Sequence, residues 1–284
     1  MLIIISRKVR HTIGIILFRI KANREIEYYR DDIDDILLYY GLIESLFGIN
    51  INFISFILIG FVRKGWLKYE RVATNKYIYV IGDEPKFNKD DFEVEEFYHI
   101  ILYAAGNDYK LSTNELLEYL KSKAGQLRLY YVKSMIKGRS YHYLWDKKII
   151  KNDGLNKTIC NAYDMFDLYS FSFNKKYTDE VEKVYGLYKF IKDYTLLDEK
   201  GIEVESYWEI LFKYSVLFNI TKNIKEIINQ KYVDDTYKNI YNETIFKLMS
   251  MNAYKQDEYL EEIKNECEKH LIASKKLYKE KFEI

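Results

Sequence analysis

The sequence predicts a mainly α-helical protein with a small β-hairpin, built from an N-terminal winged-helix-like unit and a C-terminal helical unit. The chain of 284 residues contains one proline, Pro85, which favours long helices because proline breaks the i→i−4 hydrogen-bond ladder. Apolar residues recur at helical spacing along most of the chain, and one segment alternates as paired strands do. Hydrophobic residues make up 48% and charged residues 31%, which is typical of a soluble, folded protein.

Residues 28–82 predict the winged-helix-like unit. Asp34–Leu46 has apolar residues at helical spacing, and Gly48 is a natural helix stop. Asn52–Trp66 is strongly apolar and then basic, as expected of a buried helix with a cationic last turn. The segment LKYERVATNKYIYVIG alternates, turns at ATNK and ends in a second strand, Tyr77–Ile81. Two helices followed by a hairpin are typical of a winged helix.

Residues 83–151 predict a helical unit, with a second winged helix as the open alternative. Phe92–Ala105 is an amphipathic helix with acidic residues in its first turn. Ser112–Glu115 has the sequence of a capping box, which predicts a helix from there to Lys123. Gln126–Trp145 has the pattern of a third helix.

The rest of the chain predicts a linker, residues 152–177, and a C-terminal helical unit, residues 178–284. The linker is polar and irregular, with a short strand at Leu168–Phe173. Thr178 is a natural N-cap for the first helix of the C-terminal unit. The helices predicted in this unit are Asp179–Tyr194, Val204–Phe218, Thr221–Tyr232 and Asp257–Phe282.

An N-terminal arm, residues 1–27, combines apolar runs with basic residues. Its charges interrupt the apolar runs, so the arm cannot span a membrane, and their order does not match a secretory signal. One interpretation is a strand or short hairpin laid on the fold. The other is a membrane-surface arm, because basic residues beside apolar ones suit anionic lipid. The residues that would contact the lipid are Arg7, Lys8, Arg10 and Arg19.

The segment Lys121–Lys151 is the candidate for nucleic-acid or partner binding, because basic residues alternate with aromatic ones. Basic side chains could bind phosphate while aromatic rings stack on bases. The candidate residues are Lys123, Arg128, Tyr131, Lys133, Lys137 and Arg139. The alternative is a helix whose aromatic side chains pack inward and whose charges are balanced by acidic helices nearby. The net charge of +1 favours this alternative.

The sequence indicates no catalytic residue, cofactor or metal site, and it identifies no small-molecule substrate. Cys160 and Cys267 lie far apart, which argues against a zinc site or a disulfide framework and favours the reduced cytosol. The four histidines lack metal-binding spacing, and motifs for phosphate loops, dinucleotide binding and nucleophile elbows are absent from the sequence. The acidic run Asp31–Asp35 lacks the spacing of an EF-hand and suits a helix N-terminus. An enzyme with an unrecognised site stays open as a third interpretation.

Several motifs occur in an order known from one protein family. They are EYYRDDIDDILLYYGLI with Tyr28, Tyr29 and Arg30; the turn Arg63–Leu67; KYTDEVEKVYGLYKFIKDYTLLDE; and SYWEILFKYSVLFNI with Tyr207, Trp208, Tyr214 and Val216. Together they cover about residues 26–232 and resemble the cytosolic region of the bacterial predicted-membrane-protein family "domain of unknown function 2207". The resemblance implies a winged helix, and the family has no assigned chemistry.

Relatives of that kind often carry membrane spans between the winged helix and the Trp-containing helix. Asn152–Lys176 occupies this position and is too polar to span a membrane. We therefore expect a cytoplasmic protein, with attachment to the inner face of the cell membrane left open. The leading interpretation is a non-enzymatic protein-interaction or scaffold module with a protein partner. The alternative is a nucleic-acid-binding protein that uses the helix in Lys121–Lys151.

Overall fold

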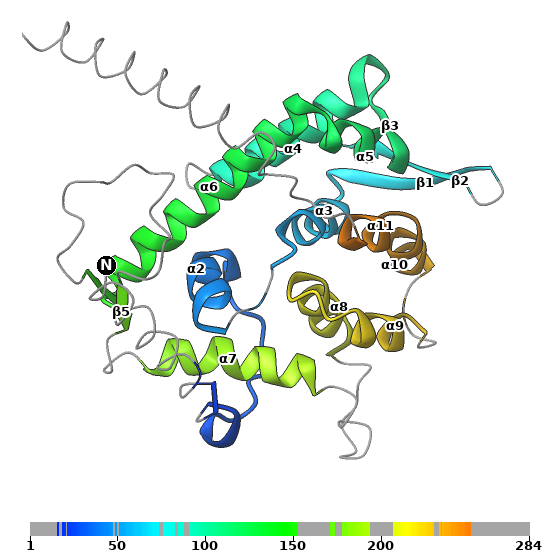
Figure 1. Ribbon diagram of the computed structural model, residues 1–284. Coiled ribbons are helices and arrows are strands. Elements are labelled where there is room, and N and C mark those ends of the chain that lie inside the picture. The colour runs from blue at the N-terminus through cyan, green and yellow to red at the C-terminus, as the bar shows by residue number, and fades with distance from the viewer. Residues whose placement is uncertain are drawn as a thin grey trace, which may run out of the picture.

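The computed structural model describes residues 22–152, 171–173, 178–193 and 207–250, with short gaps inside these ranges, together with residues 16, 19 and 20. Helices dominate and accompany a three-stranded and a two-stranded antiparallel sheet (Figure 1), which confirms the predicted fold class. The elements are η1 (Ile36–Tyr39), α2 (Tyr40–Leu42), η2 (Ile43–Phe47), α3 (Phe53–Arg63), β1 (Leu67–Ala73), β2 (Lys76–Ile81), α4 (Phe92–Ala105), η3 (Gly106–Asp108), β3 (Lys110–Ser112), α5 (Thr113–Lys121), α6 (Lys123–Asp146), β4 (Ile150–Asn152), β5 (Phe171–Phe173), α7 (Thr178–Lys192), α8 (Trp208–Leu217), α9 (Thr221–Ile228), α10 (Asp235–Ile240), η8 (Tyr241–Ile245) and α11 (Phe246–Ser250).

The first helical region differs from the uniform helix that its periodicity predicts. It passes from a 3-10 turn, η1, through α2 into a π-helical turn, η2. Asp35 has a left-handed backbone with φ 46°, so the helix begins after it and not at Asp34. The second helix, α3, begins as predicted after Asn52, whose side-chain oxygen accepts a hydrogen bond from the backbone N–H of Ser55 at 3.1 Å.

The predicted hairpin is confirmed, with Leu67 opposite Ile81 in β1 and β2. A third strand, β3, which the sequence analysis did not predict, pairs with the other edge of β2. It leads directly into α5 through the predicted capping box, in which the Ser112 hydroxyl accepts from the Glu115 N–H at 3.3 Å and the Glu115 carboxylate accepts from the Ser112 N–H at 2.7 Å. The sheet therefore combines strands from residues 28–82 and 83–151.

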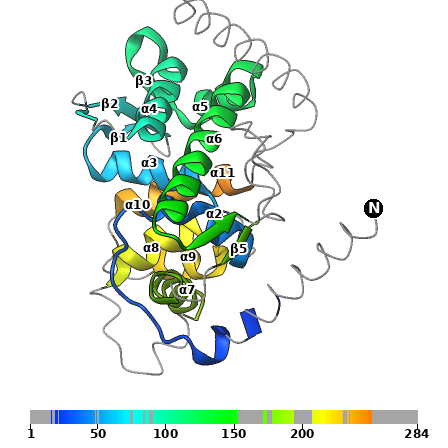
Figure 2. The same cartoon turned by 90° about the vertical axis from the view of Figure 1, so that its left-hand side faces the viewer.

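The longest described helix, α6, has 24 residues and contacts α4, α5, α2 and η1. Figure 2 shows it running from the level of the three-stranded sheet to the level of α8 and α9. It lies antiparallel to α4, because Arg128 near its start meets Glu96 while Arg139 further along meets Glu93. At its far end, the Tyr143 hydroxyl lies 3.0 Å from that of Tyr39 in η1. One helix thus spans most of the described fold.

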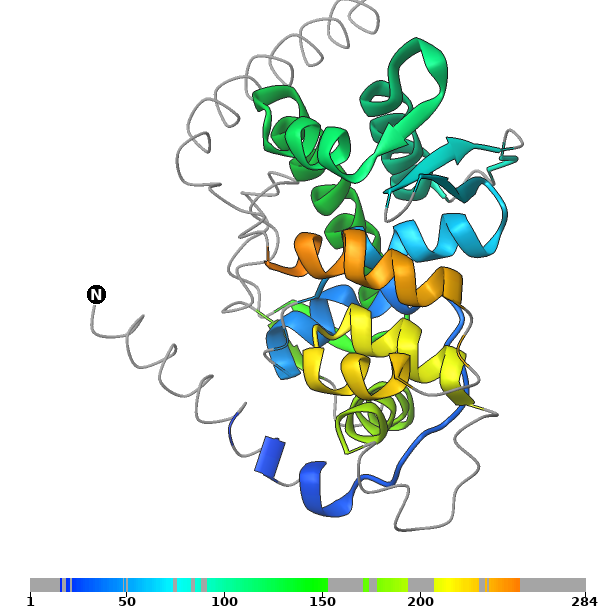
Figure 3. The ribbon, with the colours of Figure 1, turned by 90° about the vertical axis from the view of Figure 1, so that its right-hand side faces the viewer.

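The C-terminal helices pack against this framework and share its core. Figure 3 shows α10 and α11 between the sheet with α3 on one side and α8 with α9 on the other. The buried Tyr79 hydroxyl in β2 donates to the Thr244 hydroxyl at 2.8 Å, and the Thr113 hydroxyl lies 2.7 Å from the same oxygen. The backbone N–H of Asn52 donates to the carbonyl of Leu217 at 2.8 Å, which joins the start of α3 to the end of α8.

Several predictions fall outside the described residues. They concern most of the arm 1–27, most of the linker 152–177 and the whole of the helix Asp257–Phe282. Within the described ranges, no helix is both long and apolar enough to cross a membrane.

Substitution of Gly186 tests how tightly the extended segment before Arg30 packs on α7. A Cβ at Gly186 would lie 2.5 Å from the carbonyl oxygen of Glu27 and 3.1 Å from the nitrogen of Tyr29. We expect Gly186→Ala to lower the free energy of unfolding by about 1–3 kcal/mol in urea denaturation, because backbone atoms must move. Gly60→Ala is the matched control in α3, where a Cβ meets nothing within 4 Å. It should stabilise by about 0.5–1 kcal/mol through helix propensity. An equal response of the two variants would contradict the close packing.

Candidate functional site

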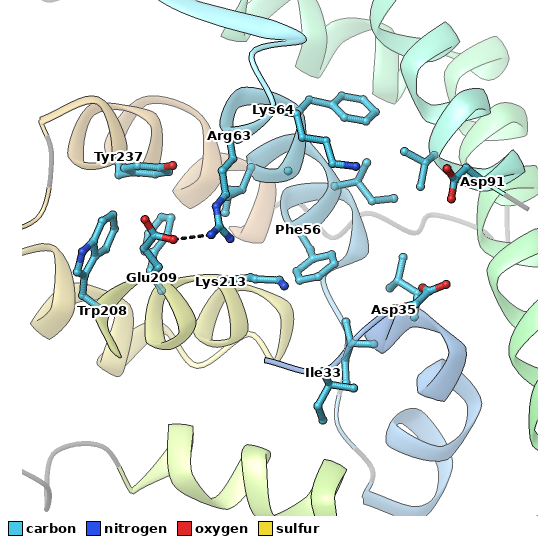
Figure 4. A pocket seen from close by; sticks show the side chains of 18 of the residues that line it. Ile33, Asp35, Phe56, Arg63, Lys64, Asp91, Trp208, Glu209, Lys213 and Tyr237 are labelled. Atoms are coloured by element: carbon cyan, nitrogen blue, oxygen red, sulfur yellow. Dashed lines mark hydrogen bonds and ion pairs between the residues drawn. The ribbon is translucent and has the colours of Figure 1, made fainter. Parts of the chain in front are cut away.

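A cleft of about 580 Å³ opens between α3, α8, η1 and the start of α4 (Figure 4). Its aromatic lining comes from Phe56 and Phe61 in α3, from Trp208 and Phe212 in α8, and from Tyr237 in α10. Its charged lining residues are Asp35, Arg63, Lys64, Asp91, Arg139, Glu209 and Lys213. Clefts of this size that combine apolar walls with a few charged groups are the common form of ligand sites.

In Figure 4 the Arg63 guanidinium points toward Glu209, whereas the Lys64 side chain extends toward the side of the cleft on which Asp91 lies. Arg63 forms an ion pair with Glu209 at 2.5 Å. The Lys64 ammonium lies 4.5 Å from the centroid of the Trp66 ring, and no carboxylate among the described residues forms an ion pair with it. Lys64 therefore differs from its neighbour Arg63 in having no carboxylate partner within the described fold.

Lys213, the third of these cations, belongs to a network that joins α8 to the segment before η1. Its ammonium lies 2.8 and 2.9 Å from the two carboxylate oxygens of Asp32. The buried Tyr214 hydroxyl donates to the same carboxylate and accepts from the N–H of Ile33 at 3.0 Å. Burial acts to raise the pKa of Asp32, but the hydrogen bonds from Lys213 and Tyr214 outweigh it and hold that pKa below its ordinary value. Burial and the bond to Asp32 raise the pKa of Tyr214.

A second network lies at the far wall, where Arg139 joins α6 to α4 and η1. Its guanidinium holds the Asp35 carboxylate through two hydrogen bonds of 2.6 and 3.0 Å and also contacts the carboxylate of Glu93. Glu93 is only 1% exposed, and burial raises its pKa although the Arg139 guanidinium opposes this. The acidic run Asp31–Asp35 is thus divided, because Asp32 pairs with Lys213 and Asp35 with Arg139. Across the described ranges, no three His, Cys, Asp or Glu side chains group as metal ligands would.

Three of the predicted basic residues of α6 form ion pairs with carboxylates on other elements. Arg128 pairs with Glu96 of α4 at 2.6 Å and also lies over the Tyr103 ring. Lys137 pairs with Glu44 of η2 at 3.0 Å. Arg139 makes the contacts described above. These cations neutralise acidic neighbours within the fold.

The other predicted site residues lie apart from one another. Lys133 is half-buried, and burial together with the nearby Lys137 charge lowers its pKa. Lys123 is exposed at the start of α6, and Tyr131 is exposed on its outer face. Of the proposed membrane-surface residues, Arg19 is half-buried in a helical segment, while Arg7, Lys8 and Arg10 lie outside the described residues.

The outer face of α6 carries a feature that the sequence analysis missed, which we call the α6 stripe. Its residues are exposed or half-buried and include no Lys, Arg, Asp or Glu: Leu127, Tyr131, Ser134, Met135, Gly138, Tyr141, His142 and Trp145. Tyr131 and Trp145 are each seven positions from Gly138, and this spacing was the available signal. The amino-acid composition of this segment does not reveal the stripe. Charged residues alternate with the stripe residues along the sequence, but they lie on other faces of the helix.

The Arg139 network can be tested by removing one partner and then both. Arg139→Met should lower the free energy of unfolding by about 3–5 kcal/mol at pH 7, because the Glu93 carboxylate stays buried without its cation. In this variant the pKa of Glu93 lies above its ordinary value of 4.5, so stability should fall as the pH rises through 4.5. Urea denaturation at pH 4 and pH 7 measures this difference. The double variant Glu93→Leu, Arg139→Met should recover most of the loss, and a double variant as unstable as the single one would contradict the argument.

Comparisons with known protein families, curated proteins and solved structures find no match for this chain. The resemblance to the family "domain of unknown function 2207" therefore stays a prediction that rests on the motifs between residues 26 and 232.

Proposed function

We propose that this protein is a non-enzymatic protein-interaction module whose contact surface is the α6 stripe. The supporting observation is an aromatic face without charged side chains on the longest described helix. Tyr131 is 47% exposed and Trp145 is 41% exposed. The stripe extends over 18 positions, or about 27 Å of helix. Exposed aromatic residues with few charges nearby are typical of the centres of protein interfaces.

The pairing of the α6 cations favours a protein partner over nucleic acid. Phosphate binding gains its strength from basic side chains that release counterions. Arg128, Lys137 and Arg139 already hold carboxylates of this chain, so each would have to exchange an internal partner for a phosphate. The net charge of +1 supplies no general attraction. A nucleic-acid-binding function stays the weaker alternative.

The spacing of the stripe suits a partner helix. Tyr131, Gly138 and Trp145 repeat every seven positions, with Ser134 and Tyr141 between them, which is the pattern of a helix-pairing seam. Gly138 lies in the middle of α6, and a Cβ there meets nothing within 4 Å. Internal packing therefore does not require this glycine, but a glycine does allow another backbone to approach closely.

The occupant that matches the stripe is a second copy of this chain. In an antiparallel pair with its two-fold axis at Gly138, Tyr131 would meet Trp145 of the partner subunit and Ser134 would meet His142 of the partner subunit. Such an isologous contact needs a self-complementary surface, and equal spacing on both sides of Gly138 provides one. The proposed module is thus a dimeric helical scaffold.

Sedimentation equilibrium of the full chain tests this proposal. The wild-type chain should dimerise, and the double variant Tyr131→Glu, Trp145→Glu should dissociate at least about 100-fold more readily, because four carboxylates would enter the contact. Tyr103→Glu is the matched control, since Tyr103 is 59% exposed on α4 and lies outside the stripe. Its dissociation constant should stay within about 3-fold of that of the wild type.

Two results would overturn the proposal. One is a wild-type chain that stays monomeric up to about 100 µM, a concentration at which even weak dimers form. The other is a dimer that both variants weaken equally, which would place the contact elsewhere. A gel-retardation assay with mixed DNA and RNA distinguishes the alternative, since retention that Arg128→Glu with Lys137→Glu abolishes would favour nucleic acid.

A further inference from the structure

The last turn of α3 contains a glycine that internal packing does not explain. Gly60 is a poor helix former at the eighth position of the 11-residue helix. Gly186 in α7 is required because Glu27 and Tyr29 lie against it, whereas a Cβ at Gly60 meets nothing within 4 Å. Gly60 lines the cleft, so its missing side chain leaves space in the cleft itself. A glycine in this position is suited to close contact with a bound molecule.

The walls around Gly60 suit an apolar body. Phe56 lies one helical turn before it, and Ile33 and Phe212 line the cleft from the segment before η1 and from α8. The cleft volume of about 580 Å³ is within the range of sites for small organic molecules. Apolar groups bound there would be removed from contact with water and would pack against aromatic and aliphatic side chains on several sides.

The charged residues at the cleft favour a ligand with a negative charge over one with a positive charge. Lys64 has no carboxylate partner among the described residues, and Arg63 beside it has a single one, Glu209. An anionic group here would gain charge-assisted hydrogen bonds from Lys64 first. The other lining cations, Arg63, Arg139 and Lys213, already hold carboxylates of this chain, which leaves Lys64 for one anionic group. The site therefore favours a single negative charge.

We infer that this cleft binds a small carboxylic acid with an apolar body. The apolar body lies against Phe56 and the open space at Gly60, and the carboxylate contacts Lys64 beside Arg63. Glu209 acts as an internal competitor, because it holds Arg63 as the carboxylate of a ligand would. This site lies on the inner side of α6, where Arg139 points, and is separate from the α6 stripe.

Isothermal titration calorimetry of the full chain with decanoate tests the inference, with decylamine as the cationic probe of equal length. The wild type should bind decanoate at least about 10-fold more tightly than decylamine, because the charge near Lys64 is positive. Lys64→Met should weaken decanoate binding at least about 10-fold. Lys68→Met is the matched control, since Lys68 is exposed on β1 and does not line the cleft, and its affinity should be unchanged.

Two further variants test the geometry in opposite directions. Gly60→Met should fill the cleft and weaken decanoate binding at least about 10-fold, with no loss of thermal stability because methionine favours a helix. Glu209→Gln should release Arg63 and tighten decanoate binding by about 3- to 10-fold. Circular dichroism melting of each variant separates a filled cleft from a failure to fold.

Three outcomes would overturn the inference. The first is a wild-type chain that does not bind decanoate at concentrations up to about 5 mM. The second is decylamine binding as tight as decanoate binding, which would show that the charge makes no contribution. The third is undiminished binding in a folded Gly60→Met variant, which would place the ligand outside the cleft. None of these outcomes depends on the oligomeric state of the chain, so the experiments test the ligand site and the proposed dimer independently.

Discussion

The rotation of α6 about its own axis is set by its buried apolar face, which includes Leu129, Val132 and Ile136, and by the ion pairs that flank this face, and both candidate surfaces depend on that rotation. Arg139 holds the buried Glu93 and the rim residue Asp35, while Arg128 and Lys137 hold Glu96 and Glu44. These contacts come from three different elements, so a turn of the helix would break all of them together. Since Glu93 is buried, breaking its contact with Arg139 would leave a charge without compensation. The apolar face and the ion pairs that flank it therefore face the fold, and the α6 stripe faces out.

Two pairs of glycines distinguish positions where the fold itself needs a glycine from positions where it does not. Gly125 and Gly186 permit close contacts with other parts of this chain, so they serve the fold itself. Gly60 and Gly138 weaken their helices without an internal benefit. A residue that lowers the stability of the fold and makes no compensating contact is expected at a functional site that needs open space. The cleft and the α6 stripe each have one such glycine near the centre.

Local signals in the sequence predicted the local structure well. The capping box at Ser112, the pairing of β1 with β2 and the start of α3 each depend on residues a few positions apart, so the sequence alone contains what is needed. The pairing of β3 with β2 was not predictable, because a three-residue strand carries little pattern. The basic residues of α6 were recognised, but their direction depends on Glu44, Glu96 and Asp35, which are far away in sequence. The cleft combines several distant segments and has no local signature.

The hydrogen bonds between the two halves of the chain bear on how the protein folds. Tyr79 and Thr244 are 165 positions apart, and Asp32 and Tyr214 are 182 positions apart. Until the C-terminal helices arrive, the hydroxyl of Tyr79 has no Thr244 to bond, and the sheet face that will contact α10 is open to water. Contacts of such long range are slow to form, because loop closure precedes any gain from burial. During synthesis, the N-terminal half must therefore wait, incompletely packed, for nearly 250 residues to leave the ribosome.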